Sequence, residues 1–193
     1  ILVNNFKSNN IKNFFEKLDG MFAIIIYDKI KDRVIVARDL QGEKTLNVYE
    51  DKNLIIISSE INAIKVYIDN LKLDHYWLQT YFNTRHFLQF NNSIYKKVKI
   101  VQPGEILEIN KLNQIKYLYR QEISNLVSEK LYNYNLKRKE HDLLEELEFL
   151  LRKNIKEMIP FKRSFCSIIS GGVDSSLVSY YLSEISKPKN IYL

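Results

Sequence analysis

The 193-residue chain is poor in the residues that mark special folds, since it has one cysteine, three prolines and five glycines. A single cysteine cannot close an internal disulfide, which excludes a disulfide-stabilised secreted domain. No apolar run reaches the roughly 18 residues of a membrane helix, because Lys, Asn, Asp or Glu interrupts every isoleucine-rich stretch. The chain also opens without a charged-then-apolar leader. We therefore expect a soluble, cytoplasmic protein with no membrane contact.

Charge and apolar content narrow the class further. Hydrophobic residues make up 46% of the chain, which is enough for a real core and excludes a wholly disordered or collagen-like protein. The net charge is +6, but the 22 lysines accompany 25 isoleucines and 19 asparagines, a bias typical of an adenine- and thymine-rich coding sequence. No block of five or six like charges occurs. A nucleic-acid partner is therefore not expected.

The first third of the chain predicts a short helix and then closely spaced strands. Helical spacing of Ile11, Phe14, Phe15 and Leu18 ends at Asp19 and Gly20. Apolar runs follow at residues 21–27, 34–37, 46–49 and 54–58. Their continuous rather than alternating apolarity favours strands that are buried on both faces, and so a sheet between other layers.

The middle of the chain mixes both kinds of element. Asp74 is placed to cap a helix, whose stripe of Trp77, Leu78, Tyr81 and Phe82 we expect in the core. Strands are predicted at residues 94–100, 105–109 and 115–119, with turns at 103–104 and 111–114. The polar stretch 120–139 then changes the composition, and we expect a domain boundary there.

The last third predicts a βαβ unit. A long amphipathic helix covers residues 143–158 and stops before Pro160. A short apolar strand at 165–169, a tight loop at 170–176 and a helix at 177–185 follow, and a second strand begins at 190. A lone unit of this kind cannot bury a parallel sheet, so most of the second domain is expected to be missing.

The loop SGGVDSS at residues 170–176 has the composition of a phosphate site. Paired glycines let the backbone turn sharply, and amides at a helix N-terminus point toward an anion. The alternative is an ordinary turn in which Asp174 caps the helix. The full string, between a strand and a helix, favours phosphate binding.

This loop resembles the pyrophosphate loop of the ATP pyrophosphatase superfamily. Further strings lie upstream in a fixed order: LDGMFA at 18–23, ARD at 37–39 with Gly42, SSEI at 58–61, and PG at 103–104. Together they resemble the N-terminal glutaminase domain of glutamine-hydrolysing asparagine synthetases. The resemblance runs from Ile1 to the end of the chain and is weak only at 120–139. The chain departs from the family strings at Leu40 and Gln41 and at residues 44–47.

The resemblance implies an α/β and α+β fold in two domains. Residues 1–125 would be the C-terminal portion of an αββα sandwich of the N-terminal-nucleophile type. Residues 126–138 would be a linker, and 139–193 the start of a parallel-sheet ATP-binding domain. The order of the strings also implies that the glutaminase cysteine nucleophile lies upstream of Ile1, so no catalytic residue is visible.

The family also implies ATP and Mg²⁺ as cofactors. In it, ATP activates aspartate as an adenylate with loss of pyrophosphate, and glutamine-derived ammonia then displaces AMP. By motif match the ATP and pyrophosphate would be held by Ile169, Ser170, Gly171, Gly172, Asp174, Ser175 and Ser176. Asp174 is also the candidate magnesium ligand. Aspartate, glutamine and ATP are the expected partners, and a homodimer is left open.

Three other readings stay open at this point. An enzyme of the β-lactam synthetase or peptide cyclase type would share both domains but use another acceptor. A non-catalytic nucleotide-binding remnant would keep the loop without turnover. A tRNA-modifying ATP pyrophosphatase would fit the basic pI of about 9.2.

The remaining polar residues have ordinary structural interpretations. His75, His86 and His141 lack metal-ligand spacing with Cys166, which we expect as a buried structural cysteine. Arg38 and Asp39 are expected to form an ion pair at a strand end. Glu60 is expected to cap the helix that follows it. The five glycines are Gly20, Gly42, Gly104, Gly171 and Gly172; all lie in the family strings, so we expect alanine to be poorly tolerated there.

Overall fold

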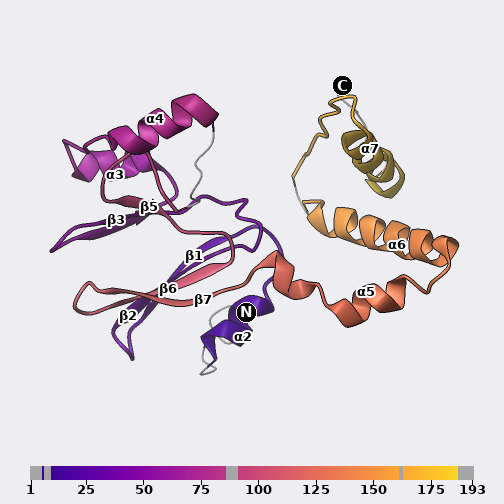
Figure 1. Cartoon of the computed structure of the whole chain (residues 1–193), viewed down its shortest axis with the longest axis horizontal. Coiled ribbons are helices and arrows are strands. Elements are labelled where there is room, and N and C mark those ends of the chain that lie inside the picture. Colours follow the sequence, from indigo (N-terminus) through magenta and orange to yellow (C-terminus); the bar gives the residue numbers. More distant parts are fainter. Residues whose placement is uncertain (1–5, 7–9, 86–90, 161–162, 187–193) are drawn as a thin grey trace. The chain divides into compact units, whose positions relative to one another are not determined.

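The computed structural model describes residue 6 and residues 10–85, 91–160 and 163–186. The chain divides into two compact units, Ile1–Leu126 and Val127–Leu193 (Figure 1). No helix in the described ranges is both long enough and apolar enough to span a membrane.

The first unit is built on two antiparallel sheets. One sheet has the strand order β1-β2-β6-β7 and the other β4-β3-β5. The strands are β1 (Ala23–Asp28), β2 (Arg33–Arg38), β3 (Asn47–Glu50), β4 (Ile55–Ser58), β5 (Val98–Ile100), β6 (Glu105–Asn110) and β7 (Ile115–Arg120). Its helices are α2 (Ile11–Glu16), α3 (Ile61–Tyr67), α4 (His75–Thr84) and the 3₁₀ turn η1 (Ile123–Leu126).

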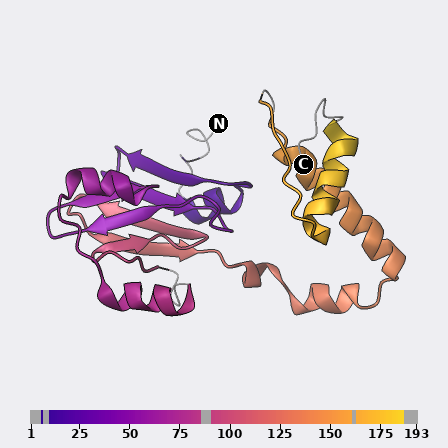
Figure 2. The same ribbon diagram turned by 90° about the horizontal axis from the view of Figure 1, so that it is seen from above.

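Alternation along the strands sorts the apolar side chains into successive layers. Val36 of β2 packs between the two sheets with Val48 of β3. The neighbours of Val36 on β2, Ile35 and Ala37, face the other way and pack against Phe14 and Phe15 of α2. On the far side, the second sheet packs against α3 through Tyr49, Ile64 and Val98. The first unit is therefore an αββα sandwich, whose stacked sheets are visible in Figure 2.

The expected helix and strands of this unit are confirmed, with two differences in the strands. Residues 94–100 contain a strand only from Val98 to Ile100. Burial on both faces is confirmed for β2 but is wrong for β1, where Ile25 and Tyr27 are about half exposed. The physical reason is position, because β1 is an edge strand of its sheet.

The aromatic stripe of α4 does not lie in the core as expected. Asp74 caps the helix by accepting hydrogen bonds from the amides of Tyr76 and Trp77. However, no residue of α4 is buried, and Phe82 is 74% exposed. Helical spacing predicts that such side chains share a face, but it carries no information on what covers that face.

Arg38 and Asp39 do not form the expected ion pair at the end of β2. The Arg38 guanidinium instead donates to the backbone carbonyls of Gly42, Lys44 and Val101, at 2.5 to 2.6 Å. The Asp39 carboxylate accepts from the amides of Glu43 at 2.9 Å and Lys44 at 3.0 Å. Because the side chains of Arg38 and Asp39 both bind backbone groups of the loop after β2, together they hold that loop in place.

Backbone hydrogen bonds of Asp39 extend this junction. Its amide donates to the Phe22 carbonyl, and its carbonyl accepts from the amides of Gly42 and Gly104. The side chain is 2% exposed. Burial alone would raise the pKa of Asp39, but the amide hydrogen bonds outweigh that effect and hold the pKa below its ordinary value.

The second unit consists of helices in the ranges described. They are α5 (Glu129–Asn135), α6 (Glu140–Met158) and α7 (Val173–Ser186). The long helix is confirmed, and the stretch expected to be a linker contains α5, capped by Ser128. Like the stripe of α4, the apolar face of α6 is largely uncovered, with Leu147 52% exposed.

The prediction of a strand at residues 165–169 is wrong, because this segment has no regular secondary structure. A strand needs a neighbour to pair its backbone groups, and the described part of the second unit contains no strand. Cys166 is accordingly exposed rather than buried. The second strand expected from residue 190 lies outside the described residues, and the parallel sheet stays a prediction.

Alanine at Gly104 should destabilise the first unit. Gly104 has φ +70°, and a Cβ there would lie 2.1 Å from the Gln121 carbonyl oxygen. We expect Gly104→Ala to lower the free energy of unfolding by about 3 kcal/mol. Urea unfolding followed by the fluorescence of Trp77, the only tryptophan, measures it. Gly20→Ala is the control, since no atom lies within 4 Å of its added Cβ and only the strain of φ +107° remains. An equal loss in both variants would contradict the steric explanation.

The Asp39 carboxylate should make stability depend on pH. Since its folded-state pKa is lowered, its stabilisation is present above the unfolded pKa of about 3.9 and is lost as the pH falls through the folded value. We expect Asp39→Asn to cost about 2 kcal/mol at pH 7 and progressively less below pH ~4. Urea unfolding at several pH values measures this. Asp69→Asn, at an exposed carboxylate, should change stability little. A cost for Asp39→Asn that is the same at pH 7 and pH 3 would sink this explanation.

Candidate functional site

The loop at residues 170–176 leads directly into α7. Val173 is the first helical residue, so Asp174, Ser175 and Ser176 form the first turn. Gly171 has φ +81°, and no atom lies within 4 Å of the place where its Cβ would be. The structure thus brings the predicted site residues together in one exposed turn, with open space beside Gly171.

Serine hydroxyls hold this turn in shape. Ser175 Oγ accepts from the Ser170 amide at 3.1 Å and lies 3.0 Å from Ser170 Oγ. The hydroxyls of Ser175 and Ser176 both donate to the Gly172 carbonyl, at 3.2 and 2.8 Å. Ser167 and Ser179 form a second contact, with 2.6 Å between their hydroxyl oxygens. Sequence reasoning missed these last two, because serines twelve positions apart have no recognisable motif.

The electrostatics of the turn suit an anion with a bound cation. The first amides of a 14-residue helix have no partner within the helix and carry the positive end of its dipole. The exposed Asp174 carboxylate lies in the same turn and adds negative charge. Backbone amides and hydroxyls are the donor set that phosphate oxygens take, so the residues present fit a phosphate chain.

A magnesium ion fits this turn only together with a phosphate. Among the residues described, no three His, Cys, Asp or Glu side chains gather into a metal site. Asp174 is therefore a single carboxylate, and Mg²⁺ is commonly held by one or two carboxylates plus substrate phosphates. Ile169, expected beside the adenosine, precedes the loop and is about one-third exposed.

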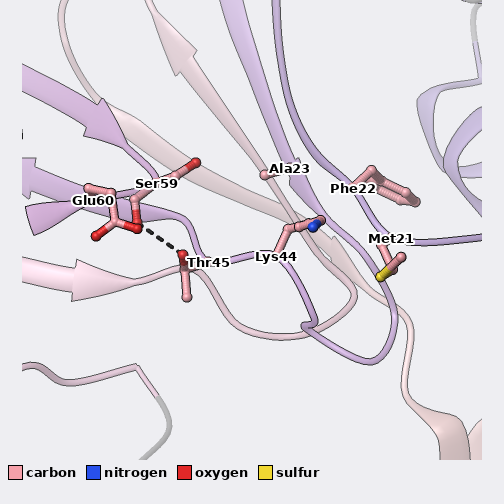
Figure 3. A pocket seen from close by; sticks show the side chains of 7 residues that line it. All are labelled: Met21, Phe22, Ala23, Lys44, Thr45, Ser59 and Glu60. Atoms are coloured by element: carbon pink, nitrogen blue, oxygen red, sulfur yellow. Dashed lines mark hydrogen bonds between the residues drawn. The ribbon is translucent and has the colours of Figure 1, made fainter. Parts of the chain in front are cut away.

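A second candidate site is an open pocket of about 520 Å³ in the first unit. Figure 3 shows its lining: Met21, Phe22, Ala23, Lys44, Thr45, Ser59 and Glu60. The Thr45 hydroxyl donates to the Ser59 carbonyl at 3.0 Å across the end of the second sheet. Most of these residues belong to the motif strings at 18–23 and 58–61. The sequence therefore identified the residues, but it did not show that they line one pocket.

The other candidates do not form sites. His75 and His141 are exposed on different helices, and His86 lies outside the described residues. Glu60 occupies the N-cap position of α3, but its side chain makes no capping hydrogen bond, so the expected cap is wrong. Its amide instead donates to the Ser58 hydroxyl at 3.2 Å.

Comparisons with known proteins agree with the upstream strings. A family model described as "Glutamine amidotransferase domain" matches residues 1–120. The glutamine-hydrolysing asparagine synthetase 2 of Bacillus subtilis is 26% identical over 192 residues, which cover 95% of this chain and 25% of that protein. The asparagine synthetase of Gallus gallus is 22% identical over 201 residues, covering 99% of this chain and 32% of that protein.

A relative with a different name is also similar. Amidase chry2 of Gibberella zeae is 22% identical over 177 residues, covering 91% of this chain and 25% of that protein. The chain thus spans between a quarter and a third of the length of these curated relatives. The family model matches well over half of the chain, and its match covers the whole αββα sandwich. The chain belongs to the glutamine amidotransferase domain family.

Proposed function

We propose that this chain is part of a glutamine-dependent asparagine synthetase. In the proposed reaction ATP adenylates aspartate with release of pyrophosphate, and ammonia from glutamine then displaces AMP. The observation that carries the proposal is one of order: an amidotransferase sandwich is followed in the same chain by SGGVDSS at the start of a helix. Relatives named asparagine synthetase align across both parts.

The loop is proposed to hold the β- and γ-phosphates of ATP. Amides of the first turn of α7 would donate to the phosphate oxygens, together with hydroxyls such as Ser170 and Ser176. These donors would stabilise the charge that develops on the departing pyrophosphate. Gly171 leaves the space that the phosphate chain needs for a close approach to the backbone.

Asp174 would otherwise repel the phosphates that the turn attracts. A magnesium ion bound there would neutralise phosphate charge and polarise a phosphoryl oxygen. The contribution of this chain is the carboxylate itself, which lies in the first turn of α7. We therefore propose Asp174 as a ligand of the Mg²⁺ that accompanies ATP.

Alanine at Gly171 should weaken nucleotide binding in the full-length protein. A Cβ there is strained by φ +81° and occupies the open space beside the turn. We expect the KM for ATP in aspartate-dependent exchange of pyrophosphate into ATP to rise about tenfold. Gly20→Ala is the matched control, because Gly20 also has a positive φ and open surroundings. We expect this variant to be less stable but to keep the wild-type KM for ATP. If the unaltered protein shows no such exchange, the proposed reaction is wrong.

The 193-residue chain alone should not form asparagine. It spans at most about a third of the length of the two asparagine synthetases that it matches. We expect no asparagine above background when the isolated chain is incubated with ATP, Mg²⁺, aspartate and either glutamine or ammonia. Mass spectrometry of the products measures this, with the full-length protein as the positive control. Asparagine made by the isolated chain would contradict the expectation.

A second candidate is an amide-forming enzyme with another acceptor. The similarity to Amidase chry2 favours keeping it, since that relative matches 91% of this chain. Pyrophosphate exchange by the full-length protein with a panel of carboxylic acids separates the two. Exchange with aspartate alone supports the synthetase, and exchange with another acid alone supports the alternative. Tight ATP binding without any exchange would indicate a nucleotide-binding remnant.

A further inference from the structure

Arg152 joins the two long helices of the second unit. From α6 its guanidinium reaches Glu184 of α7, with 2.6 Å between Nη1 and Oε2. It also lies 2.8 Å from Oε1 of Glu148, one turn earlier on α6. Its Cζ is 4.5 Å from the centre of the Tyr181 ring, a cation–π distance. One side chain therefore makes two contacts to α7.

Glu184 is itself fixed for this contact. Its other oxygen, Oε1, accepts a hydrogen bond from the Tyr180 hydroxyl at 2.7 Å. Hydrogen bonds from Tyr180 and Arg152 lower the pKa of Glu184, so the carboxylate stays charged at neutral pH. The contact is thus an ion pair in which both charged groups have their orientation set by neighbours.

In the described part of the second unit α7 is mostly exposed or only partly buried, as Leu182 and Ile185 are. Tyr181 of α7 and Ile155 of α6 are the only buried apolar residues in the described part of this unit. The Arg152 guanidinium packs on the ring of Tyr181, so the ion pair and the small apolar contact form one interface. Because this interface is small, we expect the loss of Arg152 to remove a large share of the contacts that fix the orientation of α7 relative to α6.

The angle of α7 decides where the phosphate loop lies. Glu184 is ten residues from Asp174, which is about 15 Å along an α-helix. A tilt of about 10° around the Glu184 end would move the first turn by about 2.5 Å. Misplacement by even about 1 Å is enough to harm a reacting geometry.

We propose that Arg152 is a positioning residue for the phosphate loop, acting through Glu184 and Tyr181 of α7. This inference rests on the proposed function of the loop. Arg152 touches no phosphate itself; it keeps the first turn of α7 in the orientation that binds ATP. Arginine suits the task because its planar group can pair with a carboxylate and stack on a ring together, which lysine does less well.

Removing the positive charge of Arg152 should weaken ATP binding without lowering kcat. In the full-length protein we expect Arg152→Met to raise the KM for ATP about three- to tenfold, with kcat within about twofold, because only the fraction of correctly placed loops falls. Glu184→Gln should act in the same direction. The double variant should be no worse than the stronger single one, since both remove the same contact. Arg152→Lys should lie between the wild type and Arg152→Met.

Lys153→Met is the matched control. It removes a neighbouring charge on α6 whose ion pair, with Glu157 at 4.0 Å, stays within that helix. We expect its KM for ATP to match the wild type. An unchanged KM in both Arg152→Met and Glu184→Gln overturns the inference, as does a purely additive double variant. Failure of the proposed function is distinguishable, because the unaltered protein would then show no ATP-dependent exchange.

Discussion

The first unit depends on the way in which Arg38 and Asp39 satisfy backbone groups at the end of β2. The guanidinium takes carbonyls from the loop after β2 and from Val101, which follows β5 of the other sheet. Asp39 takes amides from the same loop and, through its carbonyl, from Gly104 at the start of β6. Backbone groups that are shielded from water need hydrogen-bond partners, and two adjacent side chains supply them here for segments of both sheets. The pocket lies beside this junction, because Lys44 and Thr45 belong to the loop that it holds.

The second unit is organised by contacts of a different kind. Serine hydroxyls shape the turn before α7, and Arg152 ties the far end of that helix to α6. The apolar residues of α6 and α7 contribute little burial in the described residues. Ordering of the loop therefore rests on a few polar contacts, each of modest strength because it is exposed to water. This differs from the sandwich, where three apolar clusters fill the spaces between layers.

Support for the function is of a different kind in each of the two units. The sandwich carries the family match, which ends at residue 120, before the loop at residues 170–176 begins. The loop carries the proposed chemistry of ATP, and its support is the geometry of α7 together with relatives that align across both units. Joining them in one chain is what favours a synthetase over a simple hydrolase. Glutamine-derived ammonia needs an activated acceptor, and a pyrophosphate-releasing site would supply one.

Sequence alone determined the elements whose signal is local. Helical spacing and the cap at Asp74 located α4, and the apolar run at residues 34–37 located β2 with both faces buried. The SGGVDSS string located the loop, although α7 begins at Val173, four residues before the expected start at residue 177. These succeeded because dihedral preferences, capping and periodicity act over a few residues. Only the tertiary structure decided which strand is an edge and that Arg38 and Asp39 bind backbone rather than each other. It also decided that Cys166 and most of the α4 aromatics are exposed. Each of these depends on which segments meet in space, and a residue's own sequence neighbours carry no information about that.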